Sequence, residues 1–149
     1  MKKIFIIAAL LTGPFVMAQT KRPGSQQQSH SDKLNELYCT GMFKTTDGTI
    51  LDVASDHSAG GYLNILDWMQ GRVAGLQVYS TRSGIRIPLI RGGVAAIFID
   101  EISASAAALN ALSISDIAMV KVIKTPFYGG FNAGNGAIAI YTIEEEEDE

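Results

Sequence analysis

The stretch from Tyr128 to Thr142, YGGFNAGNGAIAIYT, runs from a loop rich in glycine and asparagine into an alternating apolar segment. Phosphate-binding loops place their glycines between a strand and the start of a helix, whereas these glycines come before a strand. Their spacing also matches neither the dinucleotide-binding fingerprint nor the Walker pattern. Glycine and asparagine tolerate positive φ, so the stretch predicts a tight turn that leads the chain back into a β-sheet.

A helical pattern lies upstream, in residues 61–75 (GYLNILDWMQGRVAG). Its apolar side chains recur at intervals of three and four, which places them on one face of a helix. They are Tyr62, Ile65, Leu66, Met69 and Val73. Gly71 is a suitable terminator. The pattern predicts a helix that buries Trp68 and Met69 in the core, with an aromatic ligand platform at Trp68 as the alternative.

Several other segments have the composition of strands, and they are residues 76–80, 85–91, 94–100, 116–124 and 137–143. The continuous apolar run 94–100 is typical of a central strand buried on both faces. Residues 103–113 have helix-forming alanines and leucines, with Ser103 as the predicted N-cap. This order of elements predicts an α+β domain with a small mixed sheet and two or three helices.

The segment 85–91 alternates strictly, with Ile85, Ile87 and Leu89 expected on one face. Pro88 falls within it and has no N–H to donate to a neighbouring strand. We therefore expect this strand to lie at a sheet edge or to contain a bulge.

The N-terminus has the features of a secretory signal, because two lysines precede the apolar run Ile4–Leu11 and small residues end at Ala18. The run is too short to span a bilayer of about 30 Å. We expect residues 1–18 to be removed on export, which leaves no membrane-spanning segment. An exported chain with Cys39 as its only cysteine forms no internal disulfide, and the apolar neighbours of Cys39 predict a buried thiol.

Three further regions follow from composition. Residues 19–33 are predicted to be a flexible lead-in, because residues 19–31 have no large apolar side chain. Residues 34–143 are predicted to form one folded domain. Residues 144–149 are six consecutive acids, predicted to be a disordered, solvated tail.

No assembled catalytic, cofactor-binding or metal site is predicted. Residues 55–58 (SDHS) have the residue types of a hydrolytic triad, but a triad is built from separated segments. Asp52, Asp56 and His57 could hold a metal only loosely, because a zinc site needs cysteines or paired histidines. A polar loop is the expected role of this region.

Two other polar groups suggest chemistry less strongly. Asp100 and Glu101 follow an apolar strand, but consecutive residues in an extended chain face opposite ways, so a turn is the expected role. Arg82, Arg86 and Arg91 form a modest basic group with no interleaved aromatic residues. Nucleic-acid binding is therefore not expected.

Five segments in order resemble the plug domain of TonB-dependent outer-membrane receptors, especially the SusC-like branch of Bacteroidetes. They are NILDWMQGRVAGLQVY (64–79), IRIPLIRGG (85–93), AAIFIDEI (95–102), LNALSISDIAMVKVIK (109–124) and the opening stretch. Each motif is short, but their shared order covers about residues 60 to 143. The resemblance implies a plug-type domain and a relation to outer-membrane transport.

Three features differ from complete receptors of that family. Glu101 stands where the family usually has glycine, and residues 19–32 have no valine or isoleucine that could form an energy-coupling box. Complete receptors also have a large β-barrel, which a domain of about 110 residues cannot form by itself. We therefore expect the domain rather than the whole transport cycle.

The leading functional hypothesis is an exported, non-catalytic, plug-like domain in the periplasm or at the outer membrane. It would act through contacts with an envelope protein, either a barrel or a component of an outer-membrane assembly. One alternative is an inactive remnant or truncation of a full receptor. Others are a small secreted enzyme that uses Asp100, Glu101 or His57, and capture of a small ligand by the loops around residues 82–91.

Overall fold

The computed structural model describes residues 29–128 and 133–143, and the structural statements below concern these residues. The predicted signal (1–18), the acidic tail (144–149) and most of the predicted lead-in lie outside them. No helix within the described residues is long and apolar enough to cross a membrane. The described chain folds as α+β, as predicted, with four short α-helices and two sheets instead of one.

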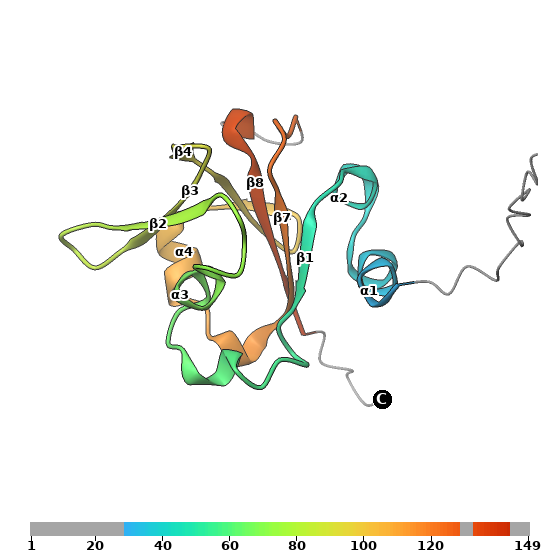
Figure 1. Ribbon diagram of the computed structural model, residues 1–149, viewed down its shortest axis with the longest axis horizontal. Helices are drawn as coiled ribbons and strands as arrows, with labels where there is room; N and C mark the ends of the chain where they lie inside the picture. Colours follow the sequence, from blue (N-terminus) through green and yellow to red (C-terminus); the bar gives the residue numbers. More distant parts are fainter. Residues whose placement is uncertain (1–28, 129–132, 144–149) are drawn as a thin grey trace, which may run out of the picture.

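Five strands form the larger sheet, in the spatial order β1-β7-β8-β5-β6. Their bounds are Thr49–Asp52 (β1), Ala96–Ile99 (β5), Ile102–Ala104 (β6), Ile117–Ile123 (β7) and Ala137–Thr142 (β8). Strand β8 runs antiparallel to β7 and parallel to β5, so the sheet is mixed, as predicted. Every residue of β7 is buried, and β7 and β8 lie in the middle of the molecule (Figure 1).

The entry into β8 depends on Gly136. Residues Ala133–Asn135 form a short 3-10 turn (η3), and Gly136 then adopts a φ of +114°. A Cβ at this position would overlap the carbonyl oxygen of Ile123 at the end of β7. The predicted tight turn is confirmed for its described residues, and it needs glycine both for φ and for space.

The apolar run 94–100 contributes to two sheets. Val94 belongs to β4 (Gly93–Val94), which pairs with β3 (Arg86–Ile90), and β3 pairs with β2 (Leu76–Ser80). These strands form a separate three-stranded antiparallel sheet. Val94 is 56% exposed, whereas Ile97 and Phe98 of β5 are buried. The prediction of one strand buried on both faces therefore holds only for the second half of the run.

Pro88 lies in the middle strand of the small sheet, which corrects the predicted edge position. Its carbonyl accepts a hydrogen bond from the N–H of Ala95 (3.0 Å). The reciprocal bond cannot form because proline has no N–H, so pairing between β3 and β4 ends there. The next amide, that of Ala96, bonds to the carbonyl of Gly136 (3.0 Å) in the larger sheet.

The burial of β3 also differs from its sequence pattern. Pro88 and Ile90 are buried, whereas Ile87 and Leu89 are only half-buried. The face with Ile87 and Leu89 is therefore the less buried one. Alternation separates the two faces of a strand but does not show which of them faces the core.

Helix α1 (His30–Tyr38) begins before residue 34, so residues 30–33 do not belong to a flexible lead-in. The Ser29 side chain accepts a hydrogen bond from the N–H of Asp32, and the Asp32 carboxylate accepts one from the N–H of Ser29. This capping box stabilises the first turn without apolar contacts. A short helix α2 (Gly41–Thr45) follows.

Helix α3 (Ile65–Met69) is shorter than the pattern predicts, and it starts at the cap formed by Asn64. Trp68 and Met69 are buried, as predicted, whereas Tyr62 lies outside the helix and is 40% exposed. The N-cap of helix α4 (Ala106–Ala111) is Ser105. Ser103, the predicted cap, instead pairs with Phe98 across β5 and β6, because the β5–β6 hairpin extends further than expected.

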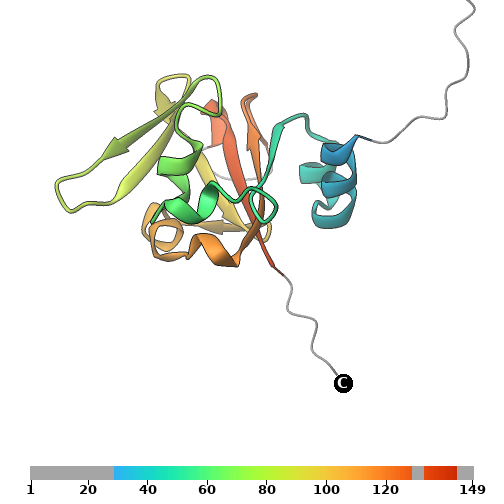
Figure 2. The same cartoon turned by 60° about the horizontal axis from the view of Figure 1, so that its bottom comes forward.

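Two apolar clusters lie on opposite faces of the larger sheet, since successive residues of a strand point to opposite faces. The first includes Ile138 and Ile140 of β8 and packs with α3, α4 and the small sheet. The second includes Ala139 and Tyr141 and packs with Cys39 and Phe43 from the N-terminal helical region. Figures 1 and 2 show α1 and α2 on the side of the sheet away from α3, α4 and the small sheet.

Candidate functional site

Asp100 and Glu101 form the two-residue turn between β5 and β6, and Ile99 pairs with Ile102 across it. Their φ angles are +48° and +64°, a left-handed conformation that non-glycine residues adopt infrequently. Positive φ at both central positions is typical of tight hairpin turns. The predicted turn is confirmed, and it forms with Glu101 where the resembled family has glycine.

Each carboxylate of this turn binds a different part of the chain. Asp100 accepts hydrogen bonds from the backbone N–H (2.8 Å) and the hydroxyl (2.9 Å) of Thr142. Glu101 accepts hydrogen bonds from the N–H of Thr40 (2.6 Å), from the Thr40 hydroxyl and from the hydroxyl of Tyr141 (3.1 Å). The two groups therefore do not act on one point as an acid–base pair. They connect the turn to β8 and to the residue that precedes α2.

A cavity of about 370 Å³ opens at this turn. It is lined by Tyr38, Thr40, Asp100, Glu101, Tyr141 and Thr142. Burial is the main cause that raises the pKa of Tyr141 far above its ordinary value, and the neighbouring Cys39 and Glu101 raise this pKa further. Burial also raises the pKa of Cys39, so the thiol is not an activated nucleophile. The cavity thus combines two carboxylates with a phenol that stays protonated.

His57 lies elsewhere, in a cavity of about 530 Å³. Asp56, His57, Tyr62, Leu63 and Ile143 are among the residues that line it, and Leu63 is 98% exposed. Asp56 accepts a hydrogen bond from the N–H of Ser58 (2.8 Å). The residues considered for a small enzyme are therefore divided between two cavities.

Ser58, the last residue of the SDHS stretch, forms hydrogen bonds with side chains of the same domain. Its hydroxyl accepts hydrogen bonds from Nε1 of Trp68 (3.1 Å) and from the guanidinium of Arg72 (2.9 Å). The same guanidinium lies over the ring of Trp68, 4.8 Å from its centroid, and over that of Tyr62, at 5.5 Å. The predicted polar loop is thus fixed to α3 by hydrogen bonds and cation–π contacts.

The loosely grouped metal candidates are also engaged in protein contacts. Asp52 contacts Nε2 of His30 (2.5 Å) and accepts a hydrogen bond from the N–H of Ser55 (3.0 Å). Burial opposes ionisation of Asp52, but these hydrogen bonds outweigh it and lower its pKa. Across residues 29–128 and 133–143, no three His, Cys, Asp or Glu side chains are grouped as metal ligands.

The three arginines do not form one patch. Arg82 lies in the turn between β2 and β3, and Arg91 follows β3 at its far end, with a φ of +55°. Five residues of extended strand separate these ends by about 16 Å. Arg86 lies between them and pairs with Asp67 of α3, with Nε to Oδ1 at 2.6 Å.

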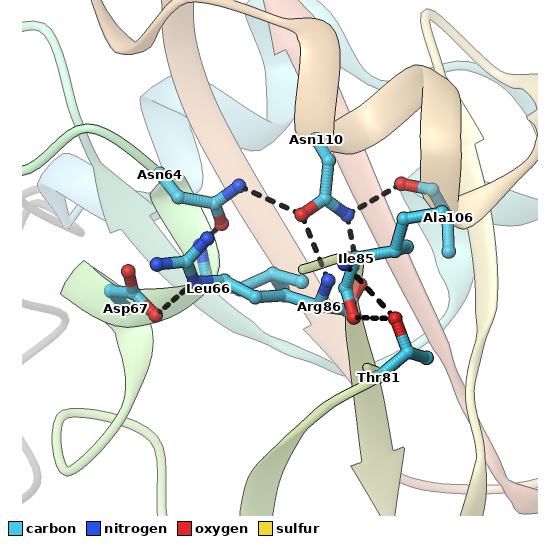
Figure 3. A network of polar contacts seen from close by, with 8 residues as sticks. All are labelled: Asn64, Leu66, Asp67, Thr81, Ile85, Arg86, Ala106 and Asn110. Carbon is cyan, nitrogen blue, oxygen red and sulfur yellow. Dashed lines mark hydrogen bonds and ion pairs between the residues drawn. The ribbon is translucent and has the colours of Figure 1, made fainter. Parts of the chain in front are cut away.

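A polar network around Asn110 joins α3, β3 and α4 (Figure 3). The Asn110 amide accepts a hydrogen bond from the N–H of Arg86 (2.9 Å) and donates one to its carbonyl (2.8 Å). Asn64 donates to the same Asn110 oxygen (3.2 Å), while its own oxygen caps α3 through Leu66 N–H (2.9 Å). Asn110 therefore pairs with β3 much as another strand would.

Three residues that shape these regions were not singled out from the sequence: Asn64, Asn110 and Lys121. Asn64 directly precedes an apolar helical pattern, which is a recognisable capping signal. Asn110 interrupts a run of alanine and leucine, and Lys121 interrupts an apolar strand. A lone polar side chain on a buried element needs a hydrogen-bond partner. A polar residue inside an apolar run was therefore the sequence signal for a structural role.

No family model and no curated protein sequence matches the chain. Solved structures of TonB-dependent receptors do match. The RagAB peptide importer in its open-open state, a SusC-like protein, is 23% identical with a TM-score of 0.56. That match covers 69% of this chain and 13% of the RagAB chain.

The ferric enterobactin receptor PfeA, in complex with BCV-L6, is 18% identical with a TM-score of 0.54. Here 65% of this chain matches 17% of the receptor. A mutant of PfeA from Pseudomonas aeruginosa gives 19% identity and a TM-score of 0.53. This chain therefore corresponds to a small part of either receptor, and its described residues have the fold of a TonB-dependent receptor plug domain.

Proposed function

We propose that this protein is an exported, plug-like domain that acts without catalysis, through contacts with an envelope protein in the periplasm or at the outer membrane. Its role belongs to the transport system in which TonB-dependent receptors work. The observation that supports this most is the fold, which is shared with the RagAB peptide importer and with the ferric enterobactin receptor PfeA.

The chemistry of the polar side chains supports a role in binding. Asp100 and Glu101 bind backbone and hydroxyl groups of the same chain, and Ser58 accepts hydrogen bonds from Trp68 and Arg72. These groups maintain the shape of the domain. Function then depends on the exposed surface, which includes large apolar side chains such as Leu63 and Ile102.

Purification of the tagged full chain from fractionated cells of its native host tests this proposal. We expect the protein in the envelope fraction, where mild detergent extraction recovers it with at least one envelope protein. An unrelated domain carrying residues 1–18 as its signal is the matched control and should recover no such protein. Recovery of the chain in the cytosol, or alone from the envelope, would contradict the proposal.

A further inference from the structure

The N-terminal cover, which we define as residues 30–46, contains α1 and α2 and lies on one face of the larger sheet. Both views show it as an outlying part of the fold (Figures 1 and 2). It ends just before Gly48, where a Cβ would meet Cγ of Lys121 and the carbonyl of Val122 at 3.0 Å. Gly48 is therefore packed on β7, and the joint lies at residues 46–47.

Few apolar side chains attach this cover. Helix α1 has no fully buried residue, and α2 buries only Phe43. Phe43 packs against Phe98 and Phe127, with ring centroids 5.0 and 4.7 Å apart. Cys39, between the two helices, is the other fully buried side chain of the cover, and two half-buried apolar side chains of α1 also pack on the same cluster. The apolar contribution is thus small compared with that of the core on the opposite face.

Polar contacts supply much of the remaining attachment. The ammonium of Lys121 on β7 donates to the side-chain oxygen of Asn35 (2.6 Å) and to the carbonyl of Phe43 (2.5 Å). Glu101 accepts hydrogen bonds from Thr40. When the cover detaches, these donors and acceptors become accessible to water and form hydrogen bonds with it. None of them is left buried without a partner.

The rest of the domain does not depend on the cover. The apolar cluster on the opposite face includes no residue from 30–46. The pairing of β7 with β8 and of β8 with β5 uses backbone groups outside the cover. Regions with few buried apolar contacts open locally at a lower free energy than the whole domain.

We propose that the N-terminal cover is a detachable unit, which opens about residues 46–47 while both sheets stay folded and so uncovers the aromatic face formed by Phe98, Phe127 and Tyr141. The aromatic face is then accessible only in the open state. The proposal concerns the motion of the chain itself and does not rest on the proposed envelope contact.

Cys39 is a native probe of this opening, because it is the only cysteine and is 2% exposed in the closed state. The labelling rate of Cys39 by a thiol reagent, divided by the rate for the denatured chain, gives the open population in the native full chain. We expect this population to exceed the globally unfolded population from urea denaturation by about 100-fold or more. Equal populations would overturn the proposal.

Two matched variants separate local from global opening. Asn35→Ala removes an anchor that exists only in the closed state, so labelling should accelerate about tenfold and the globally unfolded population should rise by about the same factor. Asn110→Ala weakens the opposite side of the sheet and should lower the urea midpoint without a matching increase in labelling. If labelling instead follows global stability in both variants, the cover is not a separate unit.

Hydrogen exchange gives an independent readout. Amides of residues 30–46 should exchange faster than those of β7 and β8, and Asn110→Ala should accelerate only the latter. Uniform acceleration across the cover and both strands would also overturn the proposal.

Discussion

The side-chain amide of Asn110 makes a two-way pair with the backbone of Arg86, accepting from its N–H at 2.9 Å and donating to its carbonyl at 2.8 Å. Helix α4 is thereby fixed to β3 by the type of bonding that joins strands. The side chain of Arg86 extends the connection to α3 through Asp67. One asparagine therefore sets how two helices lie against the small sheet (Figure 3).

Asn110→Ala is predicted to lower the free energy of unfolding by roughly 1–3 kcal/mol, because it leaves partly buried backbone groups of Arg86 without partners. The higher helix propensity of alanine offsets a fraction of this loss. Urea denaturation of the full chain measures it. Ser115→Ala, at an exposed position, is the control and should stay within about 0.5 kcal/mol of the wild type. An unchanged midpoint for Asn110→Ala would contradict the role of the network.

Gly136→Val is predicted to destabilise the domain by roughly 1–3 kcal/mol or more, through its φ of +114° and the overlap with the Ile123 carbonyl. Gly134→Ala is the matched control in the same turn, because a Cβ there meets no atom within 4 Å. Thermal denaturation of both variants checks the prediction. Equal melting temperatures would show that the turn does not need glycine at position 136.

The sequence predicted three strands of the larger sheet, β5, β7 and β8, because its signals there are local and consistent. It did not predict the two edge strands, β1 and β6. Apolar strands flank a glycine–asparagine turn, and β7 and β8 pair as that pattern requires. It did not predict the second sheet, because the chain changes sheets between two neighbouring amides: that of Ala95 bonds to Pro88 and that of Ala96 to Gly136. A sequence pattern shows that 94–100 is extended but not which strand each half will join.

The polar residues were harder to predict for a similar reason. Ser103 was predicted as the cap of α4, but the β5–β6 hairpin includes Ser103, so the helix starts two residues later at the cap formed by Ser105. Residues 30–33 look unable to fold because their capping box contains no apolar group. Glu101 was predicted to lie in a turn, but its partner Thr40 is remote in the chain and no spacing rule links them.

Two substitutions of Lys121 test how a buried ammonium group supports the N-terminal cover. Lys121 is 2% exposed, and burial lowers its pKa. Lys121→Ala should cost about 2–4 kcal/mol, since it removes both the hydrogen bonds and the packed stem. Lys121→Met keeps most of the stem and should cost clearly less. Equal losses in urea denaturation would mean that the apolar stem contributes nothing.

The burial of Tyr141 predicts a loss of stability at alkaline pH. Its pKa is raised in the folded state, mainly by burial, from an ordinary value of 10.0. A raised folded pKa means that Tyr141 contributes stability below pH 10 that is progressively lost as pH rises above it. Absorbance at high pH should show one tyrosine that ionises only when the N-terminal cover opens or the domain unfolds. In Tyr141→Phe this late component should disappear; its persistence would assign it to another tyrosine.

Photo-crosslinking in intact cells tests the central claim, contact with an envelope protein, most directly. A photoreactive amino acid replaces Leu37, Leu63, Tyr79 or Ile102 in turn, which are all more than half exposed and lie on different elements or loops. Unirradiated cells supply the background. The account predicts a light-dependent adduct with one envelope protein from at least one of the four positions, and no adduct from positions that lie outside the contact surface. No adduct above background at any of the four positions would contradict it.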